Sequence, residues 1–332
     1  MYELLNRLTQ TFGVSGNEEP IRELIINEIK DKVDEIKTDA LGNLIALKKG
    51  NADAQNHKKF MIAAHMDEIG VIATHIDDKG YIRFSNIGGV SPYTSIGQKV
   101  EFKNGITGVV SYEQKLDDIK NLKLSKMYID IGTKSREETE KFVKIGDTAC
   151  FCGSFVKQGD FAISKAMDNR AGCAVATEVI NILSKTGTDN DIYFVFTVQE
   201  ELGLRGAKTA AYQIMPDYAI AVDVTRTGDT PESHIMEVKL GEGPAIKIKD
   251  SSILCHPAVK SLLEAAAKRA NIPYQYEILE GGGTDVGAIH TTGGGVPSGA
   301  VSIPTRYIHS PTEMISLKDL ENAAKLVAEA VR

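Results

Sequence analysis

The sequence predicts an α/β protein with a mixed, mostly parallel sheet covered by helices on both faces and an inserted small β-barrel-like domain. Two observations favour this fold class. Apolar strand patterns alternate with helical patterns near the start of the chain and again after residue 164, as a largely parallel sheet requires. The segment between these parts consists mainly of short runs with strand patterns. We therefore expect one discontinuous domain, residues 1–68 and 162–332, around an inserted domain, residues 69–161.

The first 68 residues predict two helices followed by strands. Apolar side chains recur at helical spacing in two stripes, at Leu4, Leu5, Leu8 and Phe12 and at Ile21, Leu24, Ile25 and Ile29. Between the stripes, Ser15 and Glu18 match the S-x-x-E capping box, which predicts that they cap the second helix. Strand patterns follow in TDALGNLIALKKG, around a Gly-Asn turn, and in the buried run KFMIAAHMDEIG.

The inserted segment predicts a small barrel or sandwich. Turn signals such as DDKG and NG separate short apolar runs, which are VIATHI, YIRFSNI, KVEF and ITGVVSY. A charged stretch near residues 135–144 is the exception with helical character. Several short strands at this spacing are typical of a small β-barrel.

Strands and helices alternate again after residue 164. The helical patterns are DNRAGCAVATEVINILSK, RGAKTAAYQIM, PAVKSLLEAAAKRA and SLKDLENAAKLVAEAVR. The strand patterns between them are DIYFVFTV, YAIAVDV and GVPSGAVSI. Because the strand that ends near residue 65 belongs to the same pattern, the β-rich segment is best explained as an insertion into one α/β domain.

Composition excludes several classes of protein. The chain has 332 residues, of which 42% are hydrophobic and 25% charged, as in ordinary globular proteins. A net charge of −7 argues against a nucleic-acid or anionic membrane surface. No run approaches the roughly 18 apolar residues of a membrane span, and the N-terminus lacks the pattern of a signal peptide. Four cysteines do not form a disulfide framework, and we expect a cytoplasmic protein.

Polar side chains gather where the predicted strands end. In an open α/β sheet, ligands bind outside the carboxyl ends of the strands. Each residue has an ordinary explanation by itself, such as an N-cap or a turn. Together they form a mixed nitrogen and oxygen ligand set that suits Zn²⁺, Co²⁺ or Mn²⁺. These residues are His65, Asp67, Asp168, Glu200, Glu201, Asp223 and His309.

Glu200 and Glu201 stand side by side after the apolar strand of residues 191–198. Neighbouring residues of an extended chain point in opposite directions, so the two carboxylates are expected to do different work. One can bind a metal ion while the other accepts a proton from water. Asp67, two residues after His65, has the reach to accept a hydrogen bond from that imidazole and orient it.

Five ordered motifs resemble one enzyme family over essentially the whole chain. These motifs are AAHMDEIG, SKAMDNRAGC, VQEELGLRGA, AVDVT and RYIHSPTEM. They are similar to the dinuclear metallo-aminopeptidases that assemble as tetrahedral particles. This is the family of glutamyl and leucyl aminopeptidases, some of which carry the name CelM-type endoglucanase. The resemblance implies peptide substrates with a free N-terminus, self-association into a dimer-built dodecamer, and an inserted domain that serves oligomerisation and access control.

The resemblance also implies a role for each residue of the set. Asp168 would bridge two divalent metal ions, Zn²⁺ or Co²⁺ in the first place and Mn²⁺ as a further candidate. His65 and Asp223 would complete one site, and Glu201 and His309 the other. Glu200 would be the general base, and Asp67 the partner that orients His65. None of these positions departs from the family pattern.

Substrate contacts are predicted for three further residues. Thr284 and Asp285 lie in the glycine-rich stretch EGGGTDVGAIH, which the family places near the active site. A turn that caps a helix, with Thr284 as N-cap, explains this stretch equally well. Arg306 lies three residues before His309 and could contact a substrate carbonyl or carboxylate, although an ordinary salt bridge is the simpler explanation.

Other activities compete with the aminopeptidase. A metallo-carboxypeptidase or deacylase could use the same ligands but would need a cationic group for the substrate. A glycoside hydrolase uses two carboxylates without a catalytic metal, whereas these carboxylates are better explained as ligands. A non-catalytic metal-binding protein would have no need of Glu200. Acidic, aliphatic and basic residues at the substrate N-terminus all remain open.

Overall fold

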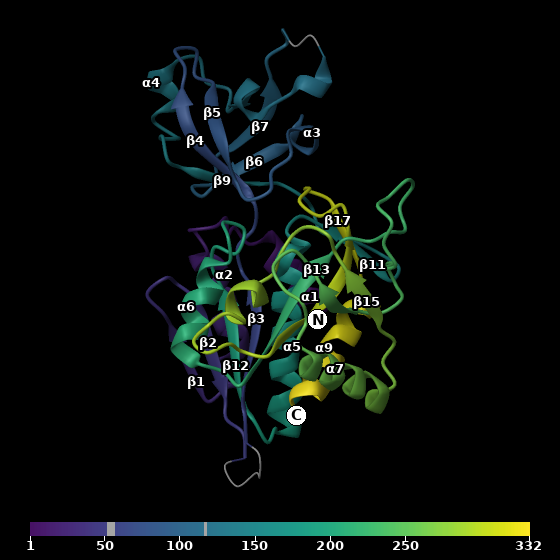
Figure 1. Cartoon of the computed structure of the whole chain (residues 1–332). Helices are drawn as coiled ribbons and strands as arrows, with labels where there is room; N and C mark the ends of the chain where they lie inside the picture. The colour runs from purple at the N-terminus through teal and green to yellow at the C-terminus, as the bar shows by residue number, and fades with distance from the viewer. Residues whose placement is uncertain (52–56, 116–117) are drawn as a thin grey trace.

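The computed structural model describes residues 1–51, 57–115 and 118–332, and it confirms the predicted fold class (Figure 1). A closed barrel stands on a larger α/β domain that contains both chain termini. The barrel follows the order β4-β5-β8-β7-β6-β9. Its strands are β4 (Gly70–Ile76), β5 (Ile82–Ile87), β6 (Lys99–Phe102), β7 (Thr107–Tyr112), β8 (Met127–Asp130) and β9 (Thr148–Phe151). The connections between these strands contain two short helices, α3 (Pro92–Ser95) and α4 (Arg136–Thr139), and the 3-10 turns Ile119–Asn121 and Leu124–Lys126.

The larger domain contains a mixed sheet whose main path runs β1-β2-β12-β3-β13-β16-β17-β11-β10. Its first strands are β1 (Glu35–Thr38), β2 (Leu44–Lys48) and β3 (Lys59–His65). After the barrel come β10 (Val156–Gln158), β11 (Phe161–Ser164), β12 (Asp191–Thr197) and β13 (Tyr218–Thr225). The last are β14 (Ala245–Lys249), β15 (Gln275–Ile278), β16 (Ser298–Arg306) and β17 (Glu313–Ser316), of which β14 pairs with β15 and β16.

Parallel pairing is concentrated in the centre of this sheet. Strands β12, β3, β13 and β16 run parallel to one another, and the pairs outside them along the main path are antiparallel. Because the four parallel strands end at one edge, residues that follow them come together there.

Helices cover both faces of the sheet. One face packs against α1 (Tyr2–Gln10), α2 (Glu19–Ile29), α5 (Met167–Thr186), α7 (Pro257–Ala270) and α9 (Leu317–Val331). The other packs against α6 (Arg205–Ile214) and α8 (Val286–Ile289). Side chains alternate accordingly along β3, where Ile62 and Ala64 face the larger layer and Met61 and Ala63 the smaller one. Of the helices in the described ranges, none is both long and apolar enough to cross a membrane.

The predicted capping box is wrong. Helix α2 begins at Glu19, and neither Ser15 nor Glu18 caps it through a side chain. The Ser15 hydroxyl instead donates a hydrogen bond to Asp67, and a Glu18 carboxylate oxygen accepts hydrogen bonds from the backbone N–H groups of Gly16 and Gln199. The local S-x-x-E pattern is present, but contacts with distant segments take both side chains.

Candidate metal centre

The fold brings the predicted metal ligands to one edge of the larger sheet. His65 is the last residue of β3, and Asp223 lies near the end of β13. Glu200 follows the end of β12, and His309 follows the end of β16. Asp168 lies in the first turn of α5, directly after β11. The shared edge is thus a consequence of the parallel central strands.

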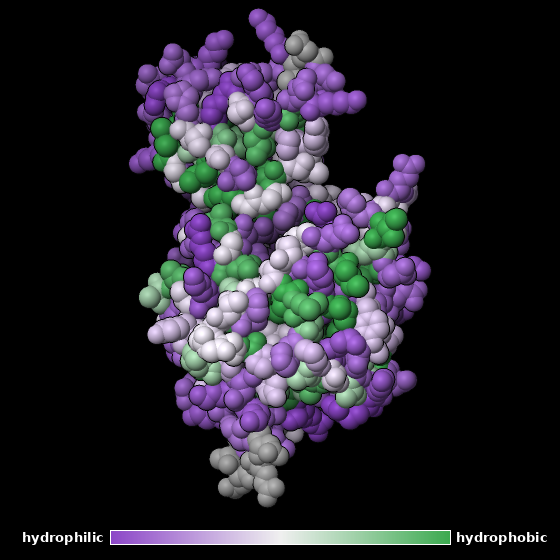
Figure 2. Space-filling model, in the orientation of Figure 1, coloured by the Kyte–Doolittle hydropathy of each residue, from purple (hydrophilic) through white to green (hydrophobic). Residues whose placement is uncertain are grey.

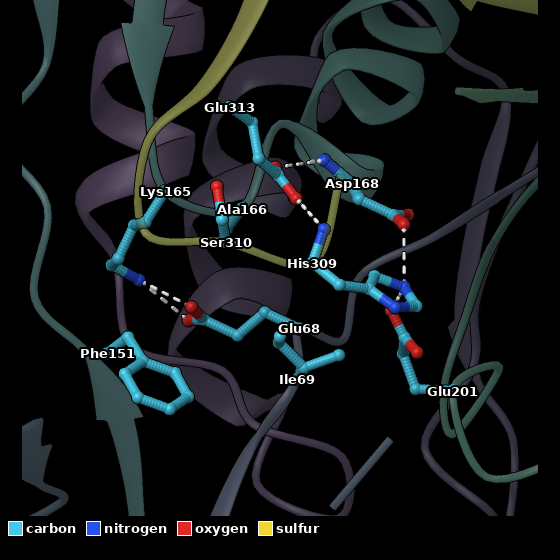
Figure 3. Close-up of a pocket in the computed structure, with 10 residues that line it drawn as sticks. All are labelled: Glu68, Ile69, Phe151, Lys165, Ala166, Asp168, Glu201, His309, Ser310 and Glu313. Atoms are coloured by element: carbon cyan, nitrogen blue, oxygen red, sulfur yellow. Dashed lines mark hydrogen bonds and ion pairs between the residues drawn. The ribbon is translucent and has the colours of Figure 1, made fainter. Parts of the chain in front are cut away.

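Asp168 lies between two histidines. One of its carboxylate oxygens is 3.1 Å from His65 Nε2. The other is 3.1 Å from His309 Nε2 (Figure 3). Glu201 Oε1 is 3.2 Å from His309 Nε2, on the same side as the second oxygen of Asp168. Asp223 Oδ1 is 3.7 Å from His65 Nε2. Each histidine therefore shares Asp168 and has a second carboxylate of its own.

Two groups of donor atoms are close enough together to hold a metal ion. One consists of His65, Glu200 and Asp223, and the other of His65, Asp168 and Glu201, with the donor atoms of each group within 4.8 Å of one another. Imidazole nitrogens and carboxylate oxygens suit Zn²⁺, Co²⁺ and Mn²⁺. The two groups share His65, and neither contains His309, so these donors fit the binding of a divalent metal ion at this centre. Glu200 Oε2 lies 4.0 Å from His65 Nε2.

Burial and neighbouring charges shift the pKa values of the groups in this centre. Burial alone would lower the pKa of His309, but hydrogen bonds to Asp168 and Glu201 raise it to about 11. Burial would raise the pKa of Asp168, but the two histidines hold it well below its usual value. Burial raises the pKa of Glu200 far above its usual value, and the neighbouring Asp223 raises it further.

Metal binding is expected to release protons and to tighten as the pH rises. With a pKa of about 11, His309 is protonated at neutral pH in the metal-free protein, whereas a metal ligand must be the neutral imidazole. Raising the pH removes this competing proton and so favours the metal. Calorimetry of Zn²⁺ binding in two buffers of different ionisation enthalpy measures the release. A binding enthalpy that is the same in both buffers would contradict this assignment.

Asp67 has more partners than the sequence predicts. Its carboxylate Oδ1 is 3.5 Å from His65 Nδ1, but the nearer acceptor for that nitrogen is the Asp67 backbone carbonyl, at 3.1 Å. The carboxylate also accepts hydrogen bonds from the backbone N–H groups of Glu200 at 3.0 Å and Glu201 at 3.2 Å. A single buried side chain therefore links the His65 segment to both glutamates.

Glu313 is a buried residue of this centre for which the sequence predicts no role. Its two carboxylate oxygens accept hydrogen bonds from the backbone N–H groups of Asp168, at 3.0 Å, and His309, at 2.8 Å (Figure 3). His309 has a left-handed backbone conformation, with φ of 63°, which is uncommon outside glycine. Glu313 thus fixes the backbone of two predicted ligands. Its place in the motif RYIHSPTEM was the available signal.

Glu313→Gln is expected to weaken metal binding by roughly 10- to 100-fold, the usual cost of losing a partner of metal ligands. The amide has the shape of the carboxylate, but its NH₂ group would face a backbone N–H donor. Competition with a chelating dye measures the affinity, and Glu321→Gln, exposed on α9, is the matched control. Unchanged metal affinity in Glu313→Gln would contradict the positioning role.

A buried ion pair lines a pocket that Asp168, Glu201 and His309 also line. Lys165 Nζ lies 2.9 and 2.6 Å from the two carboxylate oxygens of Glu68 (Figure 3). Arg170, fully buried, lies 3.3 Å from Glu68 and donates hydrogen bonds to the backbone carbonyls of Met66 and Thr11. These contacts join the start of α5, which carries Asp168, to the segment before α2 and to the segment after β3.

The three predicted substrate residues differ in their surroundings. Thr284 and Asp285 are both 2% exposed, and Asp285 accepts a hydrogen bond of 2.6 Å from the Thr197 hydroxyl. Burial raises the pKa of Asp285 to about 7. Asp285 precedes α8, and its side chain caps no N–H group of that helix. Arg306 forms a two-point ion pair with Asp229, at 3.1 and 2.7 Å. Contact of these residues with substrate stays a prediction.

Comparison with protein families gives a match over most of the chain. The model of the M42 glutamyl aminopeptidase family matches residues 42–326. A protein of Acetivibrio thermocellus, provisionally described as an aminopeptidase, is 66% identical over 100% of this chain and 98% of its own length. The lysyl aminopeptidase of Pyrococcus furiosus is 35% identical over 98% of this chain and 95% of its own length.

Solved structures with the same fold also cover nearly the whole chain. An aminopeptidase from the archaeon Desulfurococcus kamchatkensis has a TM-score of 0.94 and 40% identity, and the match covers 99% of this chain and 94% of that one. The TET1 peptidase of Pyrococcus horikoshii has a TM-score of 0.87 and 35% identity, with 99% and 98% covered. That protein can assemble into a tetrahedron or a large octahedral shell.

Proposed function

Because the chain belongs to the M42 glutamyl aminopeptidase family and is a hydrolase that acts on peptides, we propose that it removes N-terminal residues with two divalent metal ions and Glu200 as general base. The observation that carries this proposal is the position of Asp168 between His65 and His309, at 3.1 Å from each. A carboxylate that meets two histidines with its two oxygens is suited to bridging two ions.

In this proposal the ligands form two sets that share Asp168. His65 and Asp223, 3.7 Å apart, would hold one ion, and Glu201 and His309, 3.2 Å apart, would hold the other. Zn²⁺, Co²⁺ and Mn²⁺ all suit these donors, the first two in preference. When bound, such ions polarise a scissile carbonyl and lower the pKa of water from 15.7 to about 7. The Asp67 and Glu313 carboxylates would keep the chain in place around the ions, because they accept hydrogen bonds from the backbone N–H groups of Glu200 and Asp168 respectively.

Glu200 is the proposed proton carrier. It lies beside the ligands without a hydrogen bond to either histidine, since its closest approach to His65 Nε2 is 4.0 Å. Burial raises its pKa, so it holds a proton more readily than an exposed carboxylate. It would take a proton from the attacking water and deliver it to the departing amine.

Self-association is the second part of the proposal. We propose that the chain forms a dimer-built tetrahedral dodecamer in the cytoplasm, with the inserted barrel serving assembly and access to the active site. The assemblies of the Pyrococcus horikoshii TET1 peptidase support it, since this chain shares that fold over 99% of its length.

The test compares free with blocked N-termini. Chelator-stripped protein is reloaded with Zn²⁺ or Co²⁺ and given leucyl-, glutamyl- and lysyl-p-nitroanilide, and then N-acetyl-leucyl-p-nitroanilide. Hydrolysis of at least one free substrate and none of the acetylated one is expected, and the fastest substrate identifies the preferred residue. Hydrolysis of blocked or C-terminal substrates alone would favour a carboxypeptidase or deacylase. Glycosidase activity that survives the chelator would favour a glycoside hydrolase.

A further inference from the structure

The turn that carries Glu200 and Glu201 has its backbone held by side chains rather than by a neighbouring strand. Four successive N–H groups, those of residues 198–201, each donate a hydrogen bond to a buried side-chain oxygen. Asn43 accepts the first at 3.0 Å, Glu18 the second at 3.1 Å, and Asp67 the third and fourth at 3.0 and 3.2 Å.

The turn has an unusual backbone that needs such support. Gln199, directly before Glu200, has a φ of 54°, in the left-handed region that non-glycine residues seldom adopt. Conformations of this kind persist where the surroundings over-determine them, and they cluster at functional sites. The N–H group of Gln199 is the one that Glu18 accepts. Glu18 is thus the contact at the strained residue itself.

Glu18 and Ser15 reach the centre from the N-terminal segment. Glu18 is 5% exposed and Ser15 4% exposed, although both lie just before a surface helix. The Ser15 hydroxyl donates a hydrogen bond of 2.6 Å to Asp67 Oδ2, the oxygen that also holds Glu201. The segment itself is anchored beside the site, since Glu68 N–H donates to the Gly13 carbonyl at 3.0 Å.

We infer that Glu18 is a positioning residue for Glu200, and that Ser15 supports the same function through Asp67. The inference rests on the proposed role of Glu200. Without an acceptor at position 18, the Gln199 N–H loses its partner, and the left-handed turn loses one of the contacts that fix the direction of the Glu200 side chain. Proton transfer depends on that direction, whereas the His65, Asp168 and His309 ligands keep their own supports.

The test compares Glu18→Ala with Glu18→Gln, which keeps an acceptor oxygen, and with Glu19→Ala, an exposed neighbour in the first turn of α2. Each variant is reconstituted with metal, and metal content, kcat and KM are measured on the p-nitroanilide that the unaltered protein cleaves fastest. For Glu18→Ala we expect kcat to fall by about 10- to 100-fold with KM and metal content unchanged. Glu18→Gln should recover most of kcat, and Glu19→Ala should match the unaltered protein.

Ser15→Ala provides a second variant that removes one hydroxyl and little packing, and a smaller loss of kcat in the same direction is expected. An unchanged kcat in Glu18→Ala, a loss that excess metal repairs, or a Glu18→Gln variant as impaired as Glu18→Ala would overturn the inference. If the unaltered protein itself cleaves no free aminoacyl substrate with two metals bound, the proposed function fails instead. An active protein whose Glu200→Gln variant is also active contradicts the role of Glu200.

Discussion

Glu200→Gln is expected to lower kcat by about 10²- to 10⁴-fold, the range that general acid–base catalysis contributes. The amide has nearly the size of the carboxylate, but it cannot accept a proton from water at neutral pH. Its backbone contact with Asp67, at 3.0 Å, does not involve the side chain and should survive. Two metal ions should therefore remain bound while turnover is lost, which separates the base from the ligands.

The measurement pairs metal analysis with steady-state kinetics. Glu321→Gln, the same substitution at an exposed position of α9, is the matched control and should leave both quantities unchanged. If Glu200→Gln loses metal together with activity, Glu200 is a ligand, as its place in one of the two candidate groups would allow. If it stays active with both metals bound, another group transfers the proton.

Asp168→Asn is expected to reduce metal affinity by more than roughly 100-fold. That factor is the upper end of the cost of losing a residue that only hydrogen-bonds to a metal ligand, whereas Asp168 is a proposed ligand itself. The substitution replaces one of the two oxygens by an NH₂ group, which cannot bind a cation, and it removes the negative charge shared by both sites. Since each oxygen lies 3.1 Å from a different histidine, one of the two ions loses its bridging ligand outright. Activity should fall with it.

Asp217→Asn offers a matched control for this substitution. Asp217 accepts a hydrogen bond of 2.8 Å from the Lys59 N–H, at the opposite end of β3 from His65. Metal content by mass spectrometry should stay at the unaltered level in this variant. Two tightly bound ions in Asp168→Asn would show that Asp168 does not bridge.

The sequence was sufficient to predict the edge at which the site lies. His65, Glu200 and Asp223 each follow an apolar run, and buried parallel strands have this signature because both of their faces are covered. Since parallel strands end at a common edge, strand ends alone gather the candidate ligands. The fold class follows from the same alternation of strands and helices.

The supports of the site could not be predicted in this way. Ser15 and Glu18 match a local capping pattern. The pattern cannot show that the Ser15 hydroxyl bonds to Asp67 and the Glu18 carboxylate to the Gln199 N–H, because both partners lie in distant segments. Glu313 accepts hydrogen bonds from the backbone N–H groups of Asp168 and His309. Every residue except proline carries such a donor, so the sequence does not show which ones Glu313 contacts, although its motif marks the residue. Long-range hydrogen bonds to the backbone are visible only once the chain is folded.

The central claim is that two metal ions held around Asp168 make this chain an aminopeptidase. The most direct measurement titrates the chelator-stripped protein with Co²⁺ while the bound metal per chain and the hydrolysis of leucyl-, glutamyl- and lysyl-p-nitroanilide are followed together. We predict no hydrolysis without metal, and full activity toward the preferred substrate when two ions are bound per chain. Full activity in the stripped protein, or no hydrolysis of any of the three with two ions bound, would contradict the claim.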